Sequence, residues 1–106
     1  MTRTPATTRN NPDLSRVEAL VDGHVVGFSQ YHVEDDGTWC FFHTEVDDDR
    51  SGQGIGGQLA AGVMDVAREE GVRIFPECSF IRSYMARHDD TQDLVAEGAT
   101  LEPAEG

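Results

Sequence analysis

Apolar side chains recur at about every second position along three stretches in the first half of the chain, and this period is typical of β-strands. Between the first two stretches stands Asp22-Gly23, a dipeptide that favours a tight hairpin turn, and residues 34–37 form a second turn signal. The three predicted strands are residues 15–21, 24–33 and 38–46. The pattern therefore predicts an antiparallel meander of three strands.

The second half of the chain begins with a different period. Ile55, Leu59, Val63 and Val66 share one face of a helix over residues 54–70, and Gly71 is a typical C-terminal stop. Residues 72–78 read as a fourth strand, which should pair parallel to a neighbour because a helix precedes it. A second helix follows over residues 79–87, with Ser79 as its cap, and residues 93–95 add a short extended piece. The expected fold class is α+β.

The two ends of the chain lack this periodicity. Residues 1–13 are polar and contain two prolines, so we expect a flexible N-terminus. Residues 97–106 are rich in acids and are expected to form a flexible tail. One domain of residues 14–96 is therefore predicted.

Composition narrows the classes of partner. The chain has 106 residues and a formal net charge of −12, and all eight basic residues are arginine. Such a charge repels nucleic acid and anionic membranes, so neither is an expected partner. The two cysteines, Cys40 and Cys78, are too few for a disulfide scaffold and lack the pairing of a metal site. We expect a cytoplasmic protein without a membrane span.

A glycine-rich loop joins the third strand to the first helix and is the strongest functional signal in the sequence. Gly52, Gly54, Gly56 and Gly57 fall within six positions. Backbone N–H groups at a helix N-terminus have no partner within the helix and carry partial positive charge, so they can bind a phosphate. The alternative is a plain flexible turn, because glycine tolerates positive φ.

A dinucleotide-binding fold is the rival interpretation of the same loop. Gly52, Gly54 and Gly57 satisfy the Gly-x-Gly-x-x-Gly pattern, and Glu77 lies about twenty residues further on. Hairpins rather than a βαβ unit precede the loop, however, and the chain is short for a doubly wound sheet. The spacing therefore favours a phosphate site of another kind.

Four blocks in this order resemble the GNAT superfamily of acyl-CoA-dependent N-acyltransferases, and most closely its small YjdJ-type subgroup. They are His43-Thr44-Glu45-Val46, Gly52-Gln53-Gly54-Ile55-Gly56, Pro76-Glu77-Cys78-Ser79-Phe80 and Arg87-His88. The resemblance covers about residues 17–95. It implies a small mixed fold in which the glycine loop binds the pyrophosphate of coenzyme A through backbone amides.

The resemblance also implies the residues that hold acetyl-CoA. Ser51 stands where the superfamily has arginine or glutamine, and Arg50 lies one residue earlier. Arg50 is flexible and always charged, so it can still reach a phosphate. The expected cofactor residues are Arg50, Gly52, Gln53, Gly54, Ile55, Gly56, Gly57, Ser79, Tyr84, Arg87 and His88.

Acetyl transfer needs an amine that loses a proton, attacks a thioester carbonyl and expels a thiolate. Cys78, at the end of the fourth strand, is a candidate nucleophile, and His43 is its candidate base if the two strands approach each other. Glu45 is the substitute base and shares a side with His43 by the period of two. Tyr84 is a candidate acid for the leaving thiolate.

Each of these residues also has a structural interpretation. Cysteine is often buried and inert, and Tyr84 could pack in the core with Phe80. We expect Cys40 to lie in the core, and His24 and His32 to lie at the surface. The alternative function is a non-catalytic acyl-CoA-binding or interaction module on the same fold. The acceptor is an unidentified amine, either a small molecule or a basic protein tail.

Overall fold

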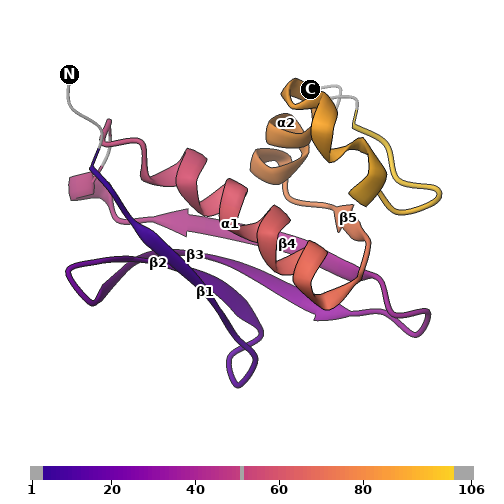
Figure 1. Ribbon diagram of the computed structural model, residues 1–106, viewed down its shortest axis with the longest axis horizontal. Helices are drawn as coiled ribbons and strands as arrows, with labels where there is room; N and C mark the ends of the chain where they lie inside the picture. Colours follow the sequence, from indigo (N-terminus) through magenta and orange to yellow (C-terminus); the bar gives the residue numbers. More distant parts are fainter. Residues whose placement is uncertain (1–3, 51, 102–106) are drawn as a thin grey trace.

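A five-stranded sheet with helices on one face forms the protein (Figure 1). The computed structural model describes residues 4–50 and 52–101. The strands are β1 (Thr7–Asn11), β2 (Arg16–Val21), β3 (His24–Val33), β4 (Trp39–Val46) and β5 (Ile74–Pro76). The helices are α1 (Ile55–Glu70) and α2 (Ser79–Arg87), with short 3-10 turns at η1 (Asp48–Arg50) and η2 (Asp89–Leu94). The strand order is β1-β2-β3-β4-β5.

The predicted meander of β2, β3 and β4 is confirmed. β2 and β3 are antiparallel and meet at the Asp22-Gly23 turn, where both residues have positive φ. β3 and β4 are also antiparallel, but Gln30 faces His43 while Tyr31 faces Phe41. Phe42 is therefore one extra residue in β4, and it forms a β-bulge that the sequence pattern did not indicate.

β1 corrects the expectation that residues 1–13 lack regular structure. Thr7–Asn11 pairs antiparallel with β2 and adds a fourth strand to the meander. This strand carries no apolar alternation because it meets its neighbours through polar groups, including the hydrogen bond that the Tyr31 hydroxyl donates to Asn10 over 2.8 Å. A hydrophobic pattern cannot reveal such a strand. Residues 1–3, also expected to be flexible, lie outside the described residues.

Helix α1 crosses one face of the sheet and supplies much of the single core (Figure 1). Ile55, Leu59, Val63 and Val66 are all buried, as the helical period predicted. Gly71 ends the helix in the left-handed region with φ 69°, and its N–H bonds back to the last turn. The sheet packs against this helix through inward residues such as Val17 and Phe41.

β5 lies parallel to β4, as the crossover through α1 predicted, but it is only three residues long. Its third residue, Pro76, ends the pairing opposite Phe41. Four antiparallel strands and one short parallel strand exclude the doubly wound sheet of a dinucleotide-binding fold.

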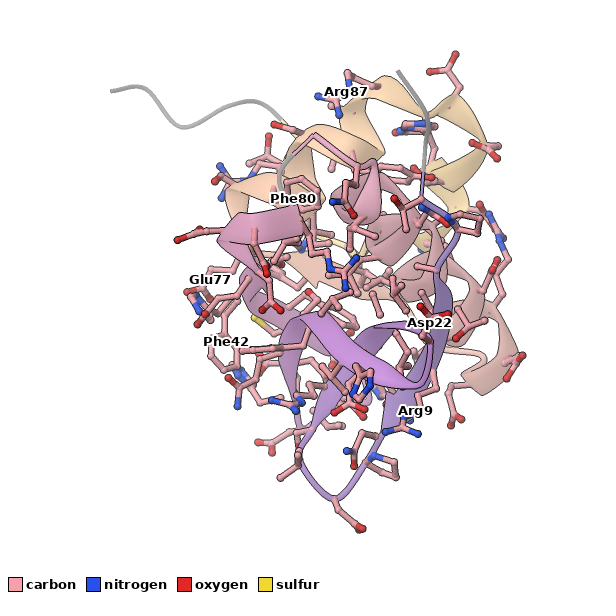
Figure 2. The ribbon with its side chains drawn as sticks, turned by 90° about the vertical axis from the view of Figure 1, so that its left-hand side faces the viewer. Arg9, Asp22, Phe42, Glu77, Phe80 and Arg87 are labelled. Atoms are coloured by element: carbon pink, nitrogen blue, oxygen red, sulfur yellow. The ribbon has the colours of Figure 1, made fainter. Side chains whose placement is uncertain are left out.

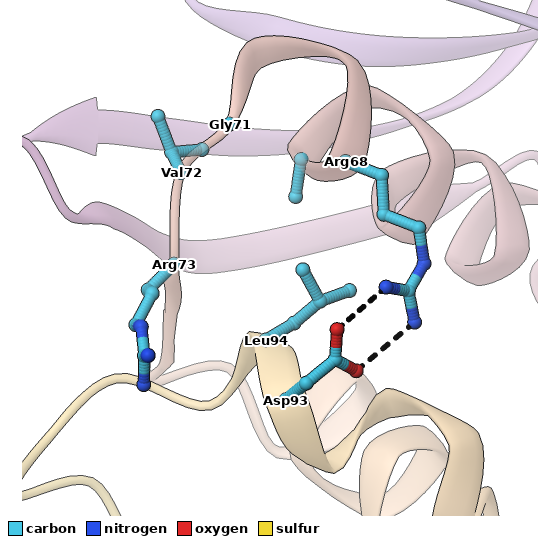
Figure 3. Close-up of a pocket in the computed structure, with 7 residues that line it drawn as sticks. Arg68, Gly71, Val72, Arg73, Asp93 and Leu94 are labelled. Atoms are coloured by element: carbon cyan, nitrogen blue, oxygen red, sulfur yellow. Dashed lines mark hydrogen bonds and ion pairs between the residues drawn. The ribbon is translucent and has the colours of Figure 1, made fainter.

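The chain after β5 returns over the same core. Helix α2 has its predicted bounds, but its N-cap is Cys78 rather than Ser79, which is the first helical residue. η2 is tied to α1 by Arg68, whose guanidinium donates two hydrogen bonds to Asp93 (Figure 3). Of the predicted extended piece, Val95 alone forms a bridge, with Ile74. The predicted tail is described only as far as residue 101, and residues 102–106 lie outside the described residues.

Candidate functional site

The start of α1 presents backbone amides that have no partner within the helix. Gly52 and Gly54 have φ of 80° and 77°, in the left-handed region that favours glycine. Gly54 is the N-cap, and no side chain caps the helix there. The first intrahelical bond runs from the N–H of Gln58 to the carbonyl of Gly54, so the amides of residues 55–57 have no partner within the helix. This is the arrangement that the glycine loop predicted.

A cleft of about 430 Å³ lies between this helix start and the end of α2. Its α1 wall is made of residues without long side chains, apart from Gln58. Arg87 brings a cation to the opposite wall (Figure 2). The cleft is lined by Gly54, Gly57, Gln58, Ala61, Tyr84, Arg87 and His88. Small residues on one wall and a cation on the other suit an anionic ligand.

Tyr84 and His88 form a stacked aromatic pair in that cleft. Their ring centroids are 3.8 Å apart with an interplanar angle of 15°. Nδ1 of His88 lies 2.6 Å from the carbonyl oxygen of Tyr84, to which its N–H donates. Burial, with help from Asp90 and Asp65, raises the pKa of the Tyr84 phenol above its ordinary value, so the phenol keeps its proton at neutral pH.

The starts of the two helices touch each other. A Cβ on Gly56 would lie 2.9 Å from the ring of Phe80, so only glycine allows the ring to approach this closely. A Cβ on Gly57 would meet nothing within 4 Å and would project into open space. Phe80 lies two residues after Cys78, and its approach to Gly56 brings the glycine loop and the start of α2 to the same end of the molecule.

β4 and β5 separate immediately beside Cys78. The N–H of Cys78 donates to the carbonyl of Phe41 over 2.8 Å, and this bond closes the paired part of the two strands. β4 continues to Val46 without β5. The N–H of Asp47 donates to Val26 on β3, so by the alternation of an antiparallel ladder the backbone groups of Thr44 and Val46 point toward the gap. The gap thus has an open edge of main-chain donors and acceptors.

Cys78 lies at this gap and begins α2. Its side chain is half-buried, and Sγ lies 3.3 Å from the hydroxyl of Thr44. As the N-cap residue it stands at the positive end of the helix dipole.

His43 does not meet Cys78. Its Nε2 lies 2.7 Å from a carboxylate oxygen of Glu45, and its ring packs against Phe28. Because neighbouring residues of a strand point to opposite faces, the contact between Thr44 and Cys78 places His43 on the other side of β4. The pairing of His43 with Cys78 is therefore not what the structure shows, whereas the shared side of His43 and Glu45 is confirmed.

Comparison with known proteins identifies the family. The family model for GCN5-related N-acetyltransferases matches residues 16–94. The chain belongs to this family. No curated protein matches it significantly.

Two solved structures of acetyltransferases are similar to the chain. A GCN5-like protein from Staphylococcus aureus, studied by NMR in solution, is 24% identical over 91% of each chain, with a TM-score of 0.63. The ribosomal-protein-alanine N-acetyltransferase from Brucella melitensis biovar Abortus 2308 is 23% identical over 86% of this chain and 66% of its own, with a TM-score of 0.46. The first likeness shows a shared fold, and membership of the YjdJ-type subgroup stays a prediction.

Within this GCN5-related domain the other predicted cofactor residues lie around the start of α1. Arg50 ends η1 and donates a hydrogen bond of 3.4 Å to the side chain of Gln53. The side chain of Ile55 is buried in the core, which leaves only its amide for a ligand. Ser79 is exposed on the first turn of α2. Ser51 lies outside the described residues.

Cys40 and the two remaining histidines lie where the sequence placed them. Cys40 is buried, and its Sγ lies 3.4 Å from a carboxylate oxygen of Glu77. Burial and the carboxylate of Glu77 raise the pKa of this thiol to about 11, so it stays protonated. His24 and His32 are exposed. Cys40 is therefore a matched, unreactive reference for Cys78.

Sequence reasoning missed Gln58, which joins the N-terminal segment to α1. Its amide nitrogen donates to the carbonyl of Thr4 over 2.6 Å, and its amide oxygen accepts from the N–H of Ala6 over 2.9 Å. These two hydrogen bonds connect residues more than fifty positions apart, so no local pattern could have indicated them. They hold the segment before β1 against one wall of the cleft.

Among residues 4–50 and 52–101, no group of three or more His, Cys, Asp or Glu side chains is arranged to hold a metal ion. Within the same residues, no helix is long and apolar enough to cross a membrane.

Proposed function

We propose that this protein transfers the acetyl group of acetyl-CoA to an amine, and that Cys78 carries the acetyl group between the two. The observation that supports this best is the meeting of two features at one end of the fold. The uncapped amides of α1 face a cleft with a cationic wall, and the thiol of Cys78 lies close by at the gap between β4 and β5.

The chain's residues fit coenzyme A. The amides of Ile55, Gly56 and Gly57 would hold the diphosphate, and Arg87 would add a charge-assisted contact. Gly57 fits this role because no atom fills the space where its Cβ would stand. When bound, acetyl-CoA supplies the acetyl group as a thioester.

The chemistry of Cys78 has two balanced steps. In the first, Sγ forms a bond to the acetyl carbon as the thioester bond breaks, and the thiol proton goes to the departing sulfur. In the second, the amine nitrogen forms a bond to that carbon as the bond to Sγ breaks, and the amine proton returns to Cys78. Neither step needs a further reactant.

Two other side chains have proposed roles in proton transfer. Tyr84 keeps its phenolic proton and lines the cleft, so it can give that proton to the departing sulfur and be reprotonated by the thiol proton of Cys78. His43 with Glu45 is exposed on the other side of β4 from the thiol, where it can take the extra proton of a cationic amine before the transfer step. The acidic surface favours a cationic amine or a basic protein tail as acceptor.

Intact-mass and peptide analysis after incubation with acetyl-CoA tests the proposal. We expect one acetyl adduct on Cys78 that is absent from C78A and retained in C40A, because the Cys40 thiol is buried and protonated. The acetylated protein should then lose its adduct when an amine is added. Comparison of the wild type with C78A and C40A shows which of the two cysteines carries the adduct.

Other outcomes separate the alternatives. Turnover of an amine without an adduct would mean direct transfer and would overturn the role of Cys78. Binding of acetyl-CoA, seen as amide shifts at residues 54–57, with neither adduct nor turnover over a panel of amines would favour the non-catalytic module. Amide signals that do not move would overturn the cofactor site itself.

A further inference from the structure

Cys78 is the end of a chain of three hydrogen-bonding side chains that enters the core. Its Sγ lies 3.3 Å from Oγ1 of Thr44, and Oγ1 lies 2.9 Å from Oγ of Ser29 on the neighbouring strand. Ser29 is fully buried, with 0% of its surface exposed. A buried hydroxyl needs a partner, and here it has one in the residue that contacts the thiol.

The pairing of β3 with β4 sets the positions of these hydrogen-bonding side chains. Ser29 stands opposite Thr44 in the register, in a pair of the ladder whose side chains lie close together. Thr44 is β-branched, so the strand leaves its hydroxyl few positions. The sulfur therefore meets a hydroxyl that the sheet holds in place.

The hydrogen bonds from Cys78 through Thr44 to Ser29 can form in both protonation states of the thiol. With the proton present, the thiol donates to Thr44, and the hydroxyl of Thr44 donates to Ser29. When the proton has left, the sulfur accepts only, and Thr44 turns its O–H toward the sulfur while Ser29 donates to Thr44. The hydrogen bond between Thr44 and Ser29 is kept in both states, and only its direction reverses.

We propose that Thr44 is a positioning residue for Cys78, and that its hydroxyl, supported by Ser29, stabilises the thiolate and holds the sulfur at the gap between β4 and β5. The meaning of this role for catalysis rests on the proposed function. The role itself concerns the thiol alone, and it exists whether or not acetyl-CoA binds.

The test is the pH profile of Cys78 alkylation by iodoacetamide, followed by peptide mass analysis. T44V keeps the shape of the side chain and removes the hydroxyl, so the midpoint of the profile should rise by about one pH unit and alkylation at pH 7 should slow about tenfold. T44S keeps the hydroxyl and should stay within about twofold of the wild type, as expected for a hydrogen-bonding role. S29A should lie between T44V and the wild type.

Cys40 reports on the fold in the same experiment, because it is buried and should react slowly in every variant. If T44V makes Cys40 reactive, the fold has opened, and S29A with T44S then decides the question. Equal profiles for the wild type and a folded T44V, or a T44S profile shifted as far as that of T44V, would overturn the proposal. No acetyl-CoA is used, so this result is independent of the acetyl-adduct experiment.

Discussion

Phe42, the extra residue of the bulge in β4, decides which side chain reaches Cys78. Without the bulge, the alternation from Phe41 would place His43 on the core side of the strand. The bulge puts Phe42 and His43 together on the open side, and Thr44 returns to the side of Cys78. One residue of register therefore exchanges an imidazole for a hydroxyl beside the thiol.

Glu18 is the second residue whose environment was unexpected, because a carboxylate is rarely buried without partners. Its side chain is 1% exposed and accepts hydrogen bonds from Arg9, Arg16 and Asn11. Burial pushes the pKa of Glu18 upward, but the hydrogen bonds from Arg16, Arg9 and Asn11 outweigh it and hold the pKa below its ordinary value of 4.5. The cluster joins β1 to β2 on the face opposite α1.

E18Q should destabilise the protein at neutral pH and much less in acid. A lowered pKa in the folded state means that the carboxylate stabilises the fold above about pH 4.5, and that this stabilisation is lost as the pH falls through the folded pKa. We expect a loss of about 1–3 kcal/mol in the free energy of unfolding at pH 7, measured by urea denaturation. At pH 3 the two proteins should differ less.

E69Q is the matched control for this substitution. Glu69 is exposed on the last turns of α1, so the same chemical change should alter the free energy of unfolding by no more than about 0.5 kcal/mol. A loss in E18Q that is equal at pH 7 and pH 3 would show that the charge of Glu18 contributes nothing to stability.

At the scale of the element, glycine stands at different positions of α1 for different physical reasons. Gly62 lies where the helix passes β1, and a Cβ there would lie 2.4–2.6 Å from side-chain atoms of Thr8. Gly57 has open space instead, and glycine within a helix costs about 1 kcal/mol relative to alanine. A residue that weakens the helix and fills no packing need is consistent with a role in binding.

G57A should therefore keep or raise stability while weakening the binding of coenzyme A. Alanine favours the helix, so the free energy of unfolding should rise by up to about 1 kcal/mol. Its methyl group would project into the space in front of the amides, and we expect at least about a tenfold weaker Kd for coenzyme A by calorimetry, or about 1.4 kcal/mol.

G62A is the comparison within the same helix. Its methyl group collides with Thr8, a stiff side chain close to the backbone of β1, so we expect a loss of about 1–3 kcal/mol in stability. Coenzyme A should still bind to the folded fraction with nearly unchanged affinity. Unchanged affinity in G57A would instead mean that the ligand does not approach the first turn of α1.

At the scale of the whole molecule, net charge is the dominant property. A formal charge of −12 on 106 residues makes the folded state repel itself, and salt screens that repulsion. The exposed ion pair between Arg68 and Asp93 is too small a contribution to reverse the effect.

The melting temperature should therefore rise by several degrees between about 10 mM and 300 mM NaCl, a range over which the screening length falls below about 10 Å. Differential scanning calorimetry measures this directly. Removal of two exposed negative charges in E69Q/E70Q, at the negative end of α1, should raise the melting temperature at low salt and flatten its salt dependence. A melting temperature that falls with salt would indicate that attractive ion pairs dominate.

Much of this architecture was predictable because it depends on local patterns. The hairpin at Asp22-Gly23, the bounds of α2 and the stop at Gly71 follow from turn chemistry and periodicity. β1 was not predictable, since its polar residues pair with β2 through backbone bonds that any side chains permit. The expectation of a cap at Ser79 was wrong by one residue because β5 ends at Pro76, two residues before the predicted end of that strand at Cys78.

The candidate site also has a part that could be predicted from local sequence and a part that could not. The glycine loop before α1 could be recognised because the proposed binding depends on the missing side chains of Gly54, Gly56 and Gly57, which the sequence states directly. The partners of Cys78 could not, because the contact with Thr44 depends on a bulge and on the point where β5 stops. Ser29 and Gln58 act through contacts between segments far apart in the chain.

The sequence by itself determined the order of the elements from β2 to α2, the glycine-rich loop before α1 and the strong negative charge. These properties belong to single residues or to neighbours along the chain. The tertiary structure decided the register of β4, the addition of β1 to the sheet and the side chains that contact the Cys78 thiol. Such properties depend on which distant segments pack together, and a shift of one residue in a strand reverses the face of every side chain that follows it.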